Sequence, residues 1–136
     1  MVDAMTISTI ELPLLLKNLK KVFGEKIHGP VNSSVREYQL VCEPEHLHQI
    51  ANFLLVRGVK KLVAINAWRE NQQKVKLAYY FIAKIGPDGL DSKIAVIVVL
   101  DPDKKTLESL TDLFVNARIF ESEISSKLDL KFQITK

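Results

Sequence analysis

Hydrophobic positions recur along this chain in two spacings, one typical of helices and one typical of strands. Apolar residues at steps of three and four predict helices over residues 10–24, 44–58 and 109–124. Alternating or continuously apolar runs predict strands over residues 25–28, 35–42, 61–67, 74–84 and 93–100. This succession predicts an α+β fold in two layers, a mixed β-sheet of about five strands packed against helices in the order α-β-β-α-β-β-β-α.

Turn-forming residues separate these elements. The cluster at 29–34 predicts a hairpin connection, and the gaps at 68–73 and 86–91 predict the two turns of a three-stranded meander. Trp68 and Arg69 lie in the first of these gaps and are candidate interface anchors, because Trp and Arg are enriched in interface hot spots. The C-terminal residues 128–134 alternate, which predicts a half-buried strand or an extended docking arm.

The run at 94–100 is apolar at every position, Ile-Ala-Val-Ile-Val-Val-Leu. A strand of this kind is usually buried on both faces. We therefore expect a central strand with helices on one side and another cover on the other, for which a partner subunit is a candidate.

Length and composition favour one soluble domain over residues 1–136. The chain has 136 residues, of which 47% are hydrophobic and 26% charged, with a net charge of +3. No apolar run approaches the roughly 20 residues needed to span a bilayer, and the N-terminus lacks a secretory signal. A cytoplasmic location is the resulting expectation.

Residues that carry chemistry are sparse. Cys42 is the single cysteine, so an iron–sulfur cluster with about four cysteine ligands is excluded. His46 and His48 point apart on a helix, where metal pairs usually sit four residues apart, so both are expected at the solvated surface. The glycines do not cluster into a phosphate cradle, and the lysine pairs lack interleaved aromatics for nucleic acid. The sequence therefore predicts no cofactor, no metal and no nucleic-acid partner.

The segment 109–124 is the most informative part of the chain. Its apolar positions share one face of the predicted helix: Leu110, Leu113, Phe114, Ala117, Phe120 and Ile124. Ser109 and Asp112 have the spacing of a capping box, with Asp where Glu or Gln is usual. Glu121 and Glu123 are two residues apart, so at least one points toward solvent or a partner. A solvated helix face is the simplest interpretation of such acids.

The run Ser-Leu-Thr-Asp-Leu-Phe at 109–114, followed by Ala117, Phe120 and Glu-Ser-Glu at 121–123, resembles the signature of the 30 kDa subunit family of respiratory NADH dehydrogenase (complex I). That family includes the equivalent subunit of energy-converting, membrane-bound nickel–iron hydrogenases. The chain departs from the family pattern at Ser122, Ser126 and Asp129, where Arg, Asp and Gly are typical. The strands at 62–66 and 75–82 resemble the two that precede the family motif.

The resemblance implies a non-catalytic scaffold subunit of a membrane-associated redox complex. It would pack against a large hydrogenase-like or quinone-reductase-like subunit and an iron–sulfur subunit, peripheral on the cytoplasmic side of the membrane. The implied interface residues are Asp112, Arg118, Phe120, Glu121 and Glu123, with Trp68 and Arg69 as a second anchor. Because Ser122 replaces the family arginine, which makes forked contacts with carboxylates, either the docking differs or the contact has moved to Arg118.

Two alternatives remain open from the sequence. One is a free-standing α+β interaction adaptor, whose apolar strand would be covered within the chain itself. The other is a small enzyme, which would need polar groups such as His28, Tyr38 and Asp112 to converge in a pocket.

Overall fold

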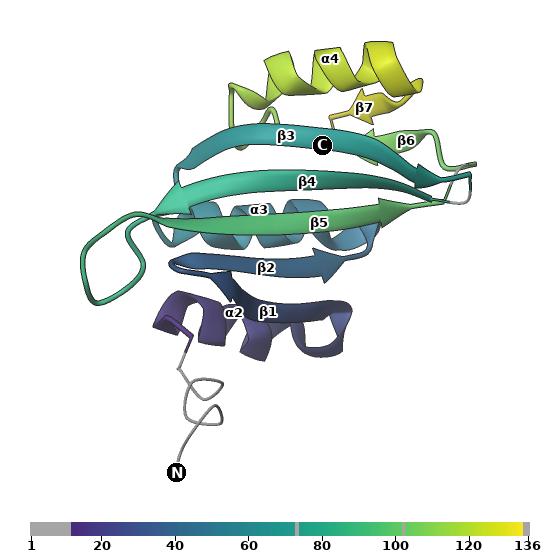
Figure 1. The fold of residues 1–136 in the computed structure, drawn as a ribbon. Helices are drawn as coiled ribbons and strands as arrows, with labels where there is room; N and C mark the ends of the chain where they lie inside the picture. Colours follow the sequence, from purple (N-terminus) through teal and green to yellow (C-terminus); the bar gives the residue numbers. More distant parts are fainter. Residues whose placement is uncertain (1–11, 73, 102, 135–136) are drawn as a thin grey trace.

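The computed structural model describes residues 12–72, 74–101 and 103–134, and its helices and strands follow the predicted order (Figure 1). The elements are α2 (Leu14–Phe23), η1 (Gly24–Lys26), β1 (Ile27–Ser34), β2 (Glu37–Cys42), η2 (Pro44–His46), α3 (Leu47–Val56), β3 (Lys61–Asn71), β4 (Lys74–Ala83), β5 (Ser92–Leu100), β6 (Thr106–Glu108), α4 (Ala117–Leu128) and β7 (Lys131–Gln133). The α+β class is confirmed. The predicted start of the first helix, residues 10 and 11, lies outside the described residues.

The main sheet has five strands in the order β1-β2-β5-β4-β3. The neighbours pair antiparallel except β2 and β5, which pair in parallel from Glu37 opposite Lys93 to Cys42 opposite Val98. The sheet is therefore mixed, and β3, β4 and β5 form the predicted meander. The entirely apolar strand β5 occupies the central position, as expected from its sequence.

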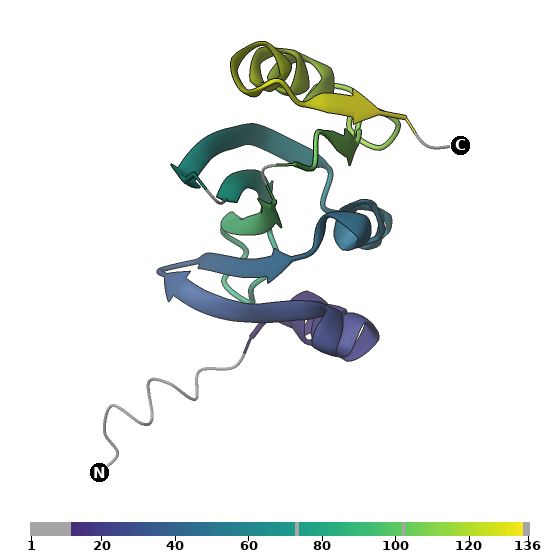
Figure 2. The same ribbon diagram turned by 90° about the vertical axis from the view of Figure 1, so that its right-hand side faces the viewer.

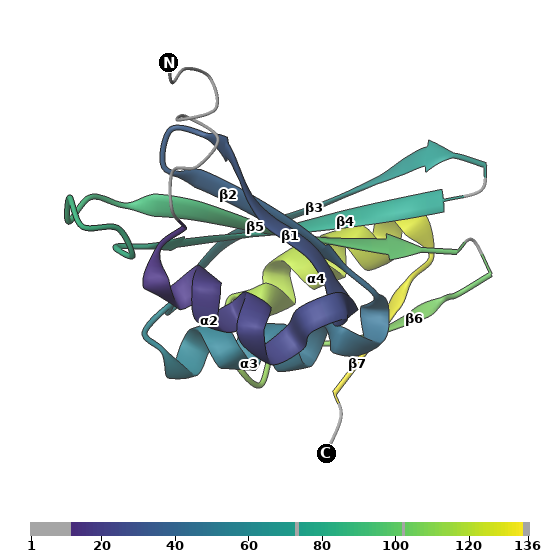
Figure 3. The ribbon, with the colours of Figure 1, turned by 90° about the horizontal axis from the view of Figure 1, so that it is seen from below.

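Helices cover one face of this sheet. Figure 2 shows α3 on one side of the strands, and Figure 3 shows α2 and α3 beneath the sheet. Fully buried side chains from both layers form the core, among them Leu16 and Leu19 of α2, Leu47 and Leu54 of α3 and Val96 of β5. The helical spacing of the first four and the strand register of the fifth bring them to one interior.

The opposite face of the sheet has no helix over it among the described residues. Side chains at the centre of this face are shielded only by side chains of adjacent strands, and the larger ones, such as Ile97 and Tyr80, are half-buried. Val31 and Trp68 are exposed by 52% and 39% on this side. The expected second cover of β5 is thus not supplied by the described part of the chain.

The connection between β1 and β2 differs from the prediction. Residues 29–34 were expected to form the turn, but they lie within β1, and the turn falls at Val35 and Arg36, where Arg36 has φ +53°. Gly29 has φ +100°, and a Cβ there would lie 2.9 Å from the Gln39 carbonyl oxygen. Glycine at 29 therefore serves a close approach between two strands and an irregular step in their pairing, not a hairpin turn.

The gap predicted at 68–73 is also shorter than expected. β3 continues to Asn71, so Trp68 and Arg69 are strand residues paired with Lys76 and Val75 of β4. Polar side chains in this stretch were interpreted as a loop, but they belong to an edge strand that extends beyond the helices, where both faces are accessible to water.

The helix predicted over 109–124 begins at Ala117 and ends at Leu128. Residues 106–108 form the short strand β6, which pairs in parallel with β7 near the C-terminus. The predicted strand at 128–134 is confirmed only over Lys131–Gln133. The apolar stripe is nevertheless interior, since Leu110, Phe114, Ala117 and Ile124 are buried.

Candidate functional site

A buried carboxylate, that of Glu121 in α4, organises the segment that resembles the family motif. Glu121 is only 5% exposed. Its Oε1 accepts a hydrogen bond from Ser109 Oγ at 2.7 Å and lies 3.3 Å from Thr111 Oγ1, while its Oε2 accepts the Leu110 backbone N–H at 2.9 Å. The two hydroxyls lie 2.8 Å from each other. Both carboxylate oxygens are thus occupied by groups of the same chain.

These bonds account for the late start of the helix. Leu110 N–H donates to Glu121, and Thr111 N–H donates to Ser109 Oγ at 3.0 Å, so both amides have acceptors outside a helical ladder. The next residues make short-range turns, with Leu113 and Phe114 donating to the Leu110 carbonyl. The predicted capping box is therefore wrong: Ser109 caps a turn, and Asp112 faces another element.

Asp112 binds a histidine 64 positions away in sequence. His48 Nε2 in α3 lies 2.9 Å from one Asp112 carboxylate oxygen and 3.1 Å from the other. Since a carboxylate only accepts, Nε2 carries the proton. His48 Nδ1 is 3.7 Å from Glu108 Oε2. His48 was expected to be a solvated surface residue, but it fastens α3 to the motif segment between two carboxylates.

Further contacts tie the same segment to both sheets. The Phe114 ring lies 5.3 Å from that of Phe81 in β4, measured between centroids. Asn116 Nδ2 donates to the Leu62 carbonyl of β3, and Ser109 N–H donates to the Gln133 carbonyl of β7 at 2.7 Å. We call residues 108–121 with their partner His48 the motif junction. It connects α3, α4, the main sheet and the β6–β7 pair.

The motif junction has a polar outer side. A hollow of about 540 Å³ opens between α4 and β7, lined by Ser109, Thr111, Arg118, Glu121, Ser122, Ser125, Phe132 and Ile134. Arg118 and Glu123 are exposed, and Phe120 is partly buried against the core. Val115 and Ile119 beside them are 82% and 67% exposed. Of the predicted interface residues on this segment, Arg118, Glu123 and Asp112 are exposed, and Asp112 is paired with His48, whereas Glu121 is buried in internal hydrogen bonds.

The second predicted anchor lies away from this segment. Trp68 and Arg69 are exposed near the far end of β3, and Trp68 shares the uncovered sheet face with Lys76 of β4. The structure thus places the two predicted groups of interface residues on different surfaces.

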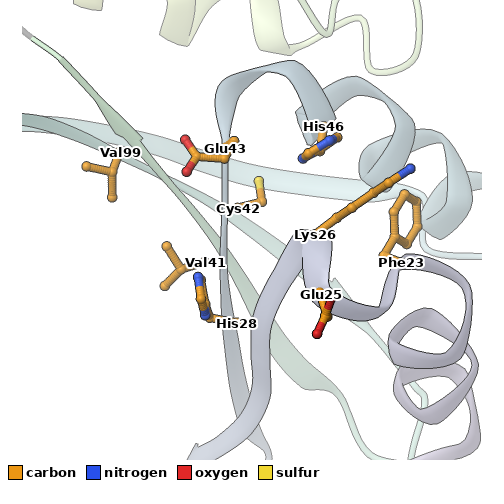
Figure 4. Close-up of a pocket in the computed structure, with 9 residues that line it drawn as sticks. All are labelled: Phe23, Glu25, Lys26, His28, Val41, Cys42, Glu43, His46 and Val99. Atoms are coloured by element: carbon orange, nitrogen blue, oxygen red, sulfur yellow. The ribbon is translucent and has the colours of Figure 1, made fainter.

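Another hollow, of about 650 Å³, opens where η1, η2 and the sheet meet (Figure 4). Its walls carry His28, Cys42, Glu43 and His46, and the Nδ1 atom of His46 is buried without a hydrogen-bond partner among the described residues. Burial, followed by the charges of Glu43 and Glu45, raises the pKa of the Cys42 thiol to about 12. Cys42 is therefore a protonated, inert thiol at neutral pH.

Catalytic groupings suggested by the sequence do not assemble. Tyr38 pairs with Ile94 on the helix side of the sheet, whereas His28 pairs with Val41 on the other side, and Asp112 is at the motif junction. Within residues 12–72, 74–101 and 103–134, no three His, Cys, Asp or Glu side chains are arranged to hold a metal ion. Over the same residues, no helix is long and apolar enough to cross a membrane.

Sequence reasoning missed the partners of Glu121 and the role of His48. The partners of Glu121 could have been suspected from the sequence, because two hydroxyl residues and a glutamate in one short motif suit an internal hydrogen-bond network. The partnership of His48 with Asp112 has no local sequence signal, because tertiary packing alone brings α3 beside the motif.

Known proteins share both this sequence pattern and this fold. The family described as respiratory-chain NADH dehydrogenase, 30 Kd subunit, matches residues 40–133. A chain of the membrane-bound sulfane sulfur reductase, an archaeal respiratory membrane complex, superposes with a TM-score of 0.73 at 14% identity, covering 90% of this chain and 70% of that one.

A trypsin-resistant fragment (1–134) of Nqo5 superposes with a TM-score of 0.67 at 20% identity, covering 88% of this chain and 92% of the fragment. No curated protein matches the chain. At these identities the two structures establish a shared fold. The family match spans more than half of the sequence and includes the whole motif junction, so this chain belongs to the 30 kDa subunit family of respiratory-chain NADH dehydrogenase.

Proposed function

We propose that this protein is a non-catalytic scaffold subunit of a membrane-associated respiratory redox complex, of the hydrogenase or NADH dehydrogenase type. The observation that carries the proposal is the motif junction. The family motif is used to fix one rigid connection between two helices and two sheets, with no side chain left poised for chemistry at its centre. A segment held in this way presents its outer residues in one fixed arrangement, which favours docking.

The outer surface of α4 is the proposed contact with a partner. Val115, just before α4, and Ile119 within it expose large apolar side chains. Glu123 lies one turn from Ile119 on the same face of α4, and the exposed Arg118 lies on the adjoining face, at the hollow. A few exposed apolar side chains framed by charges are typical of a subunit interface. Glu121 and Phe120 lie behind this surface and hold the segment in place, and the exposed Asp112 ties the segment to α3 through His48.

The proposed partners are the large hydrogenase-like or quinone-reductase-like subunit and the iron–sulfur subunit of the same complex. Membership of the 30 kDa subunit family and the fold shared with a chain of an archaeal respiratory membrane complex support this assignment. The protein would contact the membrane only through its complex, on the cytoplasmic side. Trp68, on the uncovered sheet face, and the exposed Arg69 next to it near the end of β3 are the proposed second contact.

The test is recovery of the complex from the source cells in mild detergent, followed by mass spectrometry of the proteins that accompany this chain. We expect a large catalytic-type subunit and membrane proteins. Ile119→Asp should abolish this association. Val22→Asp is the matched control, because Val22 is an equally exposed apolar residue (61% against 67%) on a different helix, α2.

Both variants should fold, since neither side chain contributes to the core. Recovery of the wild-type protein as a lone monomer would contradict the scaffold proposal. Equal recovery of the Ile119→Asp variant and the control would instead exclude the α4 surface as the contact and leave the scaffold proposal standing.

A further inference from the structure

One end of the molecule carries a basic hollow, which we define by Arg57, Lys60, Lys61 and Lys84. It has a volume of about 340 Å³ and lies where α3 ends, β3 begins and β4 ends. Val59, Ile82, Ala83 and Ile85 supply apolar lining, and Asp91 is the one carboxylate in the wall. None of its lining residues belongs to the motif junction or to α4.

The charge at the basic hollow is not neutralised by the chain. Asp91 is already bound to Lys84, with 3.0 Å between Oδ1 and Nζ. Four cations around one carboxylate leave an excess of three positive charges. The whole chain has 19 basic and 16 acidic residues and a net charge of +3. The basic hollow therefore carries a local excess of positive charge as large as the net charge of the whole chain.

Arg57 is held in position before any partner arrives. Its guanidinium carbon lies 3.6 Å from the centroid of the Phe53 ring, and its Nη1 is 3.5 Å from the Phe53 carbonyl oxygen. A stacked arginine loses little side-chain freedom when a carboxylate binds to it. Lys60 and Lys61 are exposed and, within the described residues, have no acidic partner.

The arrangement fits an acidic protein segment better than a nucleic acid. Single-stranded nucleic acids are usually bound by a basic groove with aromatic rings open for base stacking. Here the aromatic ring is Phe53, which is 7% exposed and already covered by Arg57. The apolar lining instead suits a segment that carries an apolar side chain beside its carboxylates.

We propose that the basic hollow docks an acidic segment of a neighbouring subunit, which places an apolar side chain in the hollow and carboxylates against Arg57, Lys60 and Lys61. This inference rests on the proposed scaffold function and adds a third contact with a defined partner chemistry. It predicts that part of the attachment weakens with salt, because exposed charge pairs are screened over about 8–10 Å at physiological ionic strength.

The test compares Lys60→Glu/Lys61→Glu with Lys20→Glu/Lys21→Glu in the intact complex purified from the source cells. The second variant is the control because it reverses the same number of charges at an adjacent lysine pair on α2. Lys20 Nζ also donates to the Gly24 carbonyl at 3.0 Å, so the circular dichroism spectrum of this variant must match that of the wild type. Reversal at the basic hollow should lower the fraction of the chain recovered with the complex by about tenfold or more, whereas the control should leave it unchanged.

Two measurements on the wild-type complex keep the inference testable if a variant fails to fold. Zero-length carbodiimide cross-linking should join Lys60, Lys61 or Lys84 to Asp or Glu of one neighbouring subunit. Acetylation of Lys60 and Lys61 should be slower in the complex than in the isolated chain.

The inference is overturned if Lys60 and Lys61 react equally fast in the complex and in isolation, or if attachment through them is lost on nuclease treatment. Either result leaves the scaffold function intact when the wild-type chain is still recovered with its complex. Recovery of no other subunit with the wild-type chain overturns the scaffold function and this inference together.

Discussion

Replacement of Glu121 by alanine tests whether the family glutamate acts inside the fold. The change removes the acceptor of the Leu110 N–H, which is buried and would be left without a partner, at a cost of about 1–3 kcal/mol. The hydroxyls of Ser109 and Thr111 lose the carboxylate but retain each other at 2.8 Å, which adds about 1 kcal/mol. We therefore expect Glu121→Ala to lower the free energy of unfolding by about 2–4 kcal/mol.

Urea denaturation of the isolated chain, followed by circular dichroism, measures this quantity. The slope with urea should not change, because the same surface is exposed on unfolding. Glu123→Ala is the control, since Glu123 is exposed two residues away, and its effect should stay within about 0.5 kcal/mol. The loss of stability in Glu121→Gln should lie between those of the two alanine variants, because glutamine keeps one acceptor oxygen but turns its NH₂ group toward one of the donors.

A double-mutant cycle of Glu121→Ala with Ser109→Ala isolates the bond between the two side chains. Residues in one hydrogen-bond network are coupled, so the two losses should add to more than the double variant shows. If Glu121→Ala and Glu123→Ala destabilise the chain equally and by less than about 0.5 kcal/mol, the buried carboxylate does not hold the motif junction.

Three other predictions concern single buried or paired groups. Because the fold favours the neutral Cys42 thiol, its contribution to stability should be complete below pH 9 and should fall as the pH rises from 9 toward 12. A thiol reagent at pH 8 should label the unfolded chain only, and rapid labelling of the folded chain would refute this. Tyr79 is fully buried, its hydroxyl has no hydrogen-bond partner among the described residues, and burial raises its pKa well above 10. Tyr79→Phe should therefore stabilise the chain by up to about 1 kcal/mol in urea denaturation, and a loss of stability would reveal a hidden partner. His48→Ala should lower the free energy of unfolding by about 0.5–1 kcal/mol, as expected for a partly exposed pair with Asp112, whereas the control His28→Ala should have no effect. Equal melting temperatures of the two variants would show that the bond to Asp112 contributes nothing.

The motif segment shows where sequence reasoning succeeds and where it stops. The apolar positions from Leu110 to Ile124 were predicted to share one face of a helix, and in the structure they are buried or partly buried against the core, although half of them are not helical. Burial depends on the spacing of apolar side chains, which turns and helices share over short distances. The helix boundary depends on which partners the backbone amides find, and Glu121 accepts the N–H of Leu110 from eleven positions farther along the chain.

The same distinction applies to the two glutamates. Their spacing showed that Glu121 and Glu123 cannot share a face, but no local feature assigns the interior one. The structure assigns it through Ser109, Leu110 and Thr111, whose donors lie within hydrogen-bond distance of the Glu121 carboxylate. Trp68 and Arg69 were likewise identified by residue type, and only strand pairing placed them in β3.

The sequence by itself determined the fold class, the order of the elements, the central strand and the family, because periodicity and a short motif are local properties of the chain. Tertiary structure alone decided which motif residues are internal and which remain accessible, how His48 meets Asp112, and how four basic side chains come together at the basic hollow. These outcomes depend on contacts between residues distant in sequence, and such contacts exist only once the helices have packed against the sheet.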